Sequence, residues 1–96
     1  MIPLVTPGEV LAEEFLKPLN ITGKTLAEKT RLKTSRISEI VHGKRRISAE
    51  VAMRLGLAFG TTPQFWMNLQ SQYDYEKAER EHGSLIRKEV QQLEMA

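Results

Sequence analysis

The most constraining feature of this sequence is a series of helix-start signals, each soon followed by a helix-stop signal. A start is a Ser or Thr before an apolar helical stripe, because its hydroxyl oxygen accepts a hydrogen bond from a free N–H of the first turn. A stop is a Gly that adopts a left-handed conformation, or a Pro that cannot continue the helix. This spacing leaves room mainly for short helices. The starts are Thr6, Thr22, Thr34, Ser48 and Thr62, and the stops are Pro18, Gly43 and Gly60.

These signals predict an all-α fold of five to six helices. Apolar and polar residues nowhere alternate over several β-formers, so strands are not expected. A chain of 96 residues supports one modest core and not two. We expect one domain over residues 1–75, followed by a C-terminal helical extension over 76–96 that is not a separate domain. Helices are expected over residues 7–17, 23–30, 35–42 and 49–59, from 63 onward, and over 84–96 after a break at Gly83.

Two of the expected helices, 23–30 and 35–42, are short and closely connected, as in a helix-turn-helix. Ala27 is small where the two helices would cross, and Leu32 would fill the space beneath the turn. Ile37 and Ile40 would hold the second helix from below. The opposite face would then carry polar and cationic groups at a helix N-terminus, where phosphate and base edges are bound. That face comprises Lys33, Thr34, Ser35, Arg36, Ser38 and Glu39.

Charge is distributed unevenly along the chain. Residues 29–46 hold seven Lys or Arg residues and one Glu, a net charge of +6, whereas residues 62–96 carry a net charge of −2. A basic block of this kind favours an anionic partner such as a phosphate backbone. The alternative is a solvated basic face. The two unlike halves of the chain suggest two surfaces and two partners.

Enzyme, metal and membrane functions find little support in the sequence. His42 and His82 are far apart, cysteine is absent, and no Gly-rich phosphate loop follows a strand. The adjacent carboxylates Glu13 and Glu14 cannot face one substrate from a helix. We therefore expect no catalytic residues, metal, cofactor or small-molecule substrate. No apolar run is long enough to span a membrane, residues 1–6 do not form a secretory signal, and a cytoplasmic, nucleoid-associated protein is expected.

Three motifs resemble one known family. Residues 26–45, LAEKTRLKTSRISEIVHGKR, resemble the helix-turn-helix of phage-repressor-type (XRE) regulators. PGEVL at 7–11 with EFL at 14–16 resembles the opening motif of HigA antitoxins, the group also known as VapI. FGTTPQFWMNLQ at 59–70 resembles a second motif of the same group. The central motif is shared by very many regulators, but the two flanking motifs together are specific.

The resemblance implies a phage-repressor-like fold and a dimeric antitoxin that binds a palindromic operator in double-stranded DNA. It also implies repression of its own operon and neutralisation of a HigB-type ribonuclease toxin. Two departures stand out: Arg31 replaces the Gly that usually ends the second helix in the family, and His42 stands where Asn is frequent. If Arg31 is left-handed, it carries a penalty of order 1 kcal/mol; otherwise the turn is remodelled.

The second helix of the motif, residues 35–42, would be the recognition helix. The candidates for reading bases are the hydroxyls at its start together with Arg36. Glu39 could accept from a cytosine amino group, or could instead pair with Arg36 or Arg46. The expected base-reading residues are Thr34, Ser35, Arg36, Ser38 and Glu39, and the expected contacts to the DNA backbone are Lys24, Arg31, Lys33, Lys44, Arg45 and Arg46.

Three further features bear on partners. Trp66 and Phe65 suit a core better than a ligand platform, and the acidic stretch 74–81 suits a solvated face better than a toxin-binding face. The stripe Ile86, Val90 and Leu93 has nothing in its own chain to cover it, so it is the expected homodimer interface. The alternatives are an XRE-type repressor without a toxin, or an interaction module that has lost DNA binding.

Overall fold

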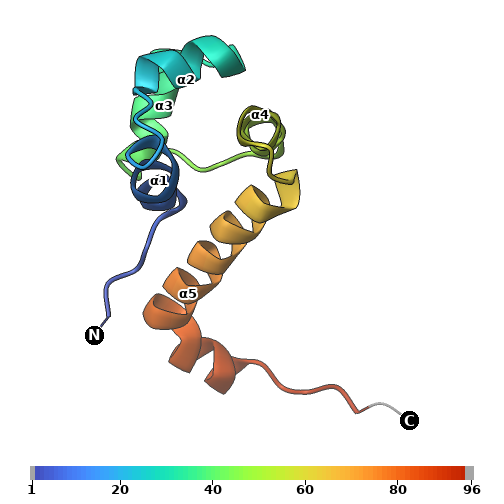
Figure 1. The fold of residues 1–96 in the computed structure, drawn as a ribbon. Helices are drawn as coiled ribbons and strands as arrows, with labels where there is room; N and C mark the ends of the chain where they lie inside the picture. The colour runs from blue at the N-terminus through green and yellow to red at the C-terminus, as the bar shows by residue number, and fades with distance from the viewer. Residues whose placement is uncertain (1, 95–96) are drawn as a thin grey trace.

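The computed structural model describes residues 2–94 and confirms the all-α fold, since every regular element among these residues is a helix. The helical segments that precede the last helix gather at one end, and the last helix extends away from them as a long rod (Figure 1). The principal extents are 53 × 33 × 21 Å. The elements are α1 (Pro7–Val10), η1 (Leu11–Leu16), α2 (Gly23–Thr30), α3 (Thr34–Val41), α4 (Ala49–Phe59) and α5 (Pro63–Glu89).

The helix predicted over residues 7–17 is present, but it is wound in two ways. Thr6 begins it as expected, because its Oγ1 accepts from the N–H of Glu9 at 3.1 Å. After α1 the chain continues as the wider π-helix η1, whose last bond runs from Lys17 N–H to the carbonyl of Ala12. Pro18 follows and supplies no N–H for a further turn. The sequence pattern predicted the length of this element but not its π winding.

The predicted bounds of α2 and α4 are confirmed at both ends. The hydroxyls of Thr22, Ser48 and Thr62 each accept from an N–H three residues on, at 3.1 to 3.3 Å. The prediction for α3 was wrong by one residue. Lys33 is its N-cap, and Thr34 is the first helical residue rather than the cap.

The core lies between α1, η1, α2, α3, α4 and the first half of α5. Trp66 is fully buried, which confirms its predicted core role, and its Nε1 donates to Thr61 Oγ1 at 2.8 Å. The ring of Phe15 lies 4.8 Å from that of Trp66 and 4.9 Å from that of Phe59. Phe65 is 38% exposed at the edge of this cluster, and Ala58 on α4 is exposed. The buried apolar residues are Leu11, Leu16, Leu26, Ala27, Leu32, Ile37, Ile40, Ile47, Val51, Ala52, Leu55 and Trp66.

The predicted break at Gly83 and the separate helix over 84–96 were wrong. α5 continues through Gly83 to Glu89, and residues 90–94 are not helical, while 95–96 lie outside the described residues. Gly83 is buried because the Glu79 and Arg87 side chains form an ion pair over it. A Cβ at Gly83 would lie 2.6 Å from Glu79 Oε1. The glycine therefore makes room for a side-chain pair rather than ending the helix.

This change of geometry corrects the predicted apolar stripe. Ile86 lies on the last turns of α5, Val90 is its C-cap, and Leu93 follows in non-helical chain, so the three do not form one helical stripe. All three are exposed, at 48%, 68% and 80%. In the part of the chain that the structure describes, none of the helices is both long and apolar enough to cross a membrane.

Candidate nucleic-acid interface

The helix-turn-helix is formed by α2, the connection 31–33 and α3, as the sequence predicted. Ala27, Leu32, Ile37 and Ile40 are all at least 93% buried, so the inward face of the motif is fully committed to the core. The outward face is open. Lys33, Thr34, Ser35 and Ser38 are exposed, and Arg36 and Glu39 are partly buried.

The N-terminus of α3 differs from those of the other α-helices. Hydroxyls of Thr6, Thr22, Ser48 and Thr62 cap α1, α2, α4 and α5. Among the described residues, no side chain caps α3. Its first N–H groups therefore remain available at the positive end of the helix dipole, beside the exposed hydroxyls of Thr34 and Ser35.

Arg36 lies on the first turn of α3 and is only partly exposed. Its Nε is buried and makes no hydrogen bond within residues 2–94. A buried donor without a partner lowers stability, and it gains a favourable hydrogen bond if a ligand supplies an acceptor. Arg36 also lines a cleft of about 520 Å³ between α3, α4 and the helix-turn-helix turn, together with Lys33 and Arg45. The side chain thus lies where an anionic acceptor would meet several cations.

The basic loop 44–46 divides into three different environments. Arg45 Nε lies 3.4 Å from Glu39 Oε2. The partner of Glu39 is therefore Arg45, and the expected pairing with Arg36 or Arg46 was wrong. Arg46 pairs with Asp74 on α5 at 2.6 Å. Within residues 2–94, Lys44 makes no ion pair, and it is exposed. Lys44 is therefore the loop cation with the least competition for a phosphate.

A buried glutamine fixes the end of this loop. Gln70 on α5 is 6% exposed, and its Oε1 accepts from Ile47 N–H at 2.8 Å. Its amide donates to Asp74 Oδ1 at 3.0 Å, and Asp74 holds Arg46. Sequence reasoning missed Gln70, because its partner lies 23 residues away and nothing local indicates the pairing.

The remaining predicted cations flank the motif. Lys24 is exposed on the first turn of α2, and Lys33 is exposed immediately before α3. Arg31 is exposed and left-handed, with φ 61°, so the first of the two alternatives for this departure is the one the structure shows. The second departure, His42, lies at the other end of α3, where its Nδ1 contacts the Ser38 carbonyl at 2.8 Å.

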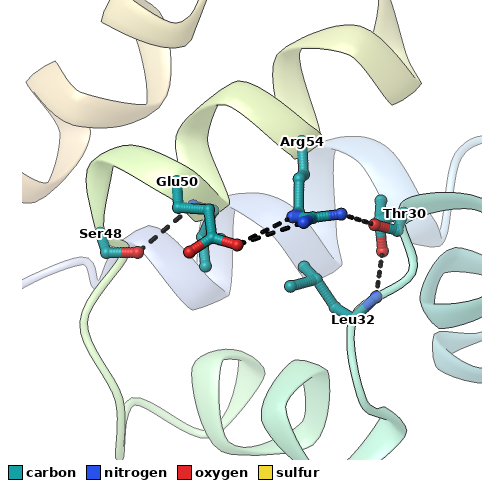
Figure 2. Close-up of polar contacts among 6 residues, drawn as sticks. Thr30, Leu32, Ser48, Glu50 and Arg54 are labelled. Carbon is teal, nitrogen blue, oxygen red and sulfur yellow. Dashed lines mark hydrogen bonds and ion pairs between the residues drawn. The ribbon is translucent and has the colours of Figure 1, made fainter.

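A second missed group joins α4 to the turn (Figure 2). The Nη1 of Arg54 donates to the carbonyl of Thr30 at 2.9 Å, and its Nε and Nη2 lie 3.3 and 3.2 Å from Glu50 Oε1. The hydroxyl of Thr30 donates to the Leu26 carbonyl at 2.7 Å. The four-residue spacing of Glu50 and Arg54 was the only available sequence signal.

Metal chemistry receives no support from the arrangement of side chains. Across residues 2–94, no three His, Asp or Glu side chains gather as a metal site would require. What the site offers is exposed hydroxyls, free helix N–H groups and exposed cations, which suit an extended anion.

Comparison with known proteins yields one family model and a consistent set of relatives. The model described as Helix-turn-helix matches residues 13–66. Virulence-associated protein I of Dichelobacter nodosus is 42% identical over 84 residues, which cover 88% of this chain and 78% of the relative. Antitoxin HigA-1 of Vibrio cholerae is 41% identical over 70 residues, 73% of this chain and 66% of the relative. The chain spans 61–63% of the length of other regulators that it matches.

A solved structure extends the similarity to nearly the whole fold. The Pseudomonas aeruginosa antitoxin HigA, in a structure with the higBA promoter, superposes with a TM-score of 0.90 at 39% identity. The match covers 96% of this chain and 100% of that one. The similarity therefore includes α5 as well as the helix-turn-helix.

Proposed function

Because this chain belongs to the XRE-type helix-turn-helix family, among the HigA and VapI antitoxins, we propose that it binds a palindromic operator and represses its own operon. The first turn of α3 enters the major groove, where Thr34, Ser35 and Arg36 meet base edges. Ser38 and Glu39 lie one turn further along the same helix.

The family consists of DNA-binding regulators and antitoxins and is not a family of enzymes. In our proposal Lys44 and Lys33 contact phosphates and set the register of the protein on DNA. Lys24, Arg31, Arg45 and Arg46 add to the positive field around them. Arg45 and Arg46 must exchange or share their partners Glu39 and Asp74 when they reach a phosphate.

The single observation that carries this proposal is the uncapped N-terminus of α3. Four other helices begin with a hydroxyl that satisfies a free N–H, whereas α3 leaves its first N–H groups for a ligand. Around this terminus lie exposed hydroxyls and a cleft lined by Arg36, Lys33 and Arg45. A DNA backbone and base edges satisfy both features at once.

We further propose that the protein acts as a homodimer and neutralises a ribonuclease toxin of the HigB type. A two-fold dimer places two recognition helices on inverted half-sites, which increases the affinity for DNA and fixes the register of the protein on it. The candidate dimer contact lies where α5 ends, away from the core. It consists of the exposed side chains of Ile86 on the last turns of the helix and of Val90 and Leu93 just after it. The remaining exposed surface of α5 offers acidic groups to a basic toxin.

The test is a binding titration on the promoter upstream of the protein's own gene, compared with a scrambled duplex, at several salt concentrations. About eight phosphate contacts per dimer give a slope near −7 in log affinity against log salt. Lys44→Ala should weaken both duplexes alike and flatten the slope by about one unit per subunit. Lys17→Ala removes the same charge beside Glu13, outside the basic region, and is the matched control.

Arg36→Ala distinguishes base reading from backbone contact. Operator affinity should fall by ~1–3 kcal/mol, with a much smaller loss on the scrambled duplex. The fold should change by no more than ~0.5 kcal/mol, because the variant also removes a buried donor that has no partner in the protein. Equal affinity for promoter and scrambled duplex in the unmodified protein would refute sequence-specific binding.

A further inference from the structure

Four residues among 2–94 have a left-handed backbone, and three of them close in the same way. They are Asn20, Arg31, Gly43 and Gly60. After Asn20, Gly43 and Gly60, the next N–H donates to a carbonyl five residues back, at 2.8 to 3.0 Å: Ile21 to Leu16, Lys44 to Glu39 and Thr61 to Gly56. This is the usual backbone closure of a helix C-terminus.

The turn of the helix-turn-helix closes differently. Leu32 follows the left-handed Arg31, and its N–H meets the hydroxyl of Thr30 at 3.4 Å rather than a carbonyl five residues back. The end of α2 is completed by side chains instead. Thr30 Oγ1 donates to the Leu26 carbonyl, and Arg54 Nη1 donates to the Thr30 carbonyl (Figure 2).

Arg54 is held for this contact by its own helix. Glu50, one turn earlier on α4, accepts from two of its nitrogens, and the hydroxyl of Ser48 caps that same end of α4 (Figure 2). Thr30 and Leu32 are 5% and 7% exposed, so the bond reaches a turn whose neighbouring side chains are already in the core. The bond from Arg54 to the Thr30 carbonyl is partly buried, and a charged donor forms a stronger hydrogen bond than a neutral one.

We infer that Arg54 is a positioning residue for operator binding: it holds the turn between α2 and α3 in the conformation that aims the first turn of α3 at DNA. This inference rests on the proposed function. Arg31 makes the hold necessary, because a side chain in the left-handed region disfavours the turn that Gly would adopt freely. Arg54 acts through the Thr30 carbonyl and does not itself touch DNA.

The experiment combines Arg54→Met, which preserves length without donors, with Arg31→Gly, which relieves the left-handed strain. Operator affinity and salt slope are measured by anisotropy at a temperature where circular dichroism shows each variant fully folded. Arg54→Met should reduce operator affinity about tenfold, in line with the loss of one charge-assisted hydrogen bond. The salt slope should be unchanged, and Arg54→Lys should lose affinity to a smaller extent.

The decisive comparison is the same substitution in two backgrounds. In the Arg31→Gly background, Arg54→Met should reduce affinity less than threefold relative to Arg31→Gly alone, because the turn no longer needs the side-chain hold. An equal loss in both backgrounds, with a salt slope shallower by about one unit per subunit, would mean that Arg54 contacts a phosphate directly. Unchanged operator affinity in Arg54→Met would overturn the inference.

Amide hydrogen exchange keeps this test separate from the proposed function. Exchange at Leu32 should accelerate in Arg54→Met more than exchange at Thr61, which closes a turn through backbone alone. If the unmodified protein binds no operator but Leu32 behaves in this way, the proposed function fails and the hold on the turn stands. If Leu32 and Thr61 respond alike, Arg54 contributes only general stability.

Discussion

The two halves of α5 belong to one continuous helix but meet very different surroundings. In the first half, Trp66 is fully buried and Gln70 is 6% exposed, and both are bonded to other parts of the chain. In the second half Gly83 is the buried residue, and it is covered by side chains of its own helix. Leu85 and Ile86 are exposed there, at 56% and 48%.

This difference shows that one helix serves two purposes. The first half completes the core and fixes the basic loop through Gln70, so it is required for the site to exist. The second half extends from the core (Figure 1) and buries little apolar surface within the chain. A helix this polar and exposed is stabilised by local pairs and by partners rather than by its own core.

The largest expected contrast comes from truncating one apolar side chain in each half. Trp66→Ala should reduce the free energy of unfolding by ~3–5 kcal/mol, because it opens a cavity among three other aromatic rings. Ile86→Ala should change it by no more than ~0.5 kcal/mol in dilute monomer. Chemical denaturation at low concentration measures both values.

Sedimentation of the same Ile86→Ala protein sharpens the contrast. At tens of micromolar, its dimer should dissociate more readily than that of the unmodified chain, because Ile86 lies in the candidate dimer contact. If both variants lose similar stability as dilute monomers, the division between the two halves of α5 would be wrong.

The next effect comes from placing a methyl group on a glycine of the core region. A Cβ at Gly8 would lie 1.8 Å from the carbonyl oxygen of Ile40, which is backbone of α3 and cannot rotate away. Gly8→Ala should therefore cost at least the upper end of the ~1–3 kcal/mol that overpacking typically costs. Operator binding should weaken as well, since α1 is forced away from the recognition helix. Thermal unfolding checks the first effect; wild-type stability would contradict the close approach.

The same substitution in the extended half of α5 should have the opposite sign. At Gly83 a Cβ meets the ends of the Glu79 and Arg87 side chains, which are flexible and can move into solvent. Gly83→Ala should then raise the free energy of unfolding by up to ~1 kcal/mol, the difference in helix propensity between the two residues. A measured loss of stability would show that the ion pair over Gly83 matters more than the propensity of the helix.

Short-range signals explain why most of the fold could be predicted from the sequence. A hydroxyl before an apolar stripe needs only three residues to act as a cap, and Thr22, Ser48 and Thr62 behave accordingly. Buried spacing within one helix is equally local, so Ile37 and Ile40 were predicted correctly.

The misses arise where a distant or missing contact decides. Thr34 has the side chain of a cap, but the chain uses Lys33 and leaves the helix end open. Gly83 is a residue type that often ends a helix, but the ion pair of Glu79 and Arg87, eight residues apart, covers it and the helix continues. Arg54 and Gln70 act on partners 24 and 23 residues away, and only the folded chain brings those groups together.

Acid titration of the Glu79–Arg87 pair should give the smallest effect, and that effect should be confined to the second half of α5. The hydrogen bond from Arg87 lowers the pKa of Glu79 below its ordinary value of 4.5, and the nearby positive charge acts in the same direction. Because the pKa is lowered in the folded state, the pair stabilises the helix at pH values above the ordinary pKa. This contribution is lost as the pH falls through the folded-state pKa. Because both groups are solvent-exposed, the change should be seen in Glu79 itself rather than in global unfolding.

Carboxyl chemical shifts followed from pH 7 downward should give a Glu79 midpoint below 4.5 that moves up in Arg87→Gln. A midpoint that is the same in both proteins would mean that the pair does not persist in solution, and that the second half of α5 is held by helix propensity alone.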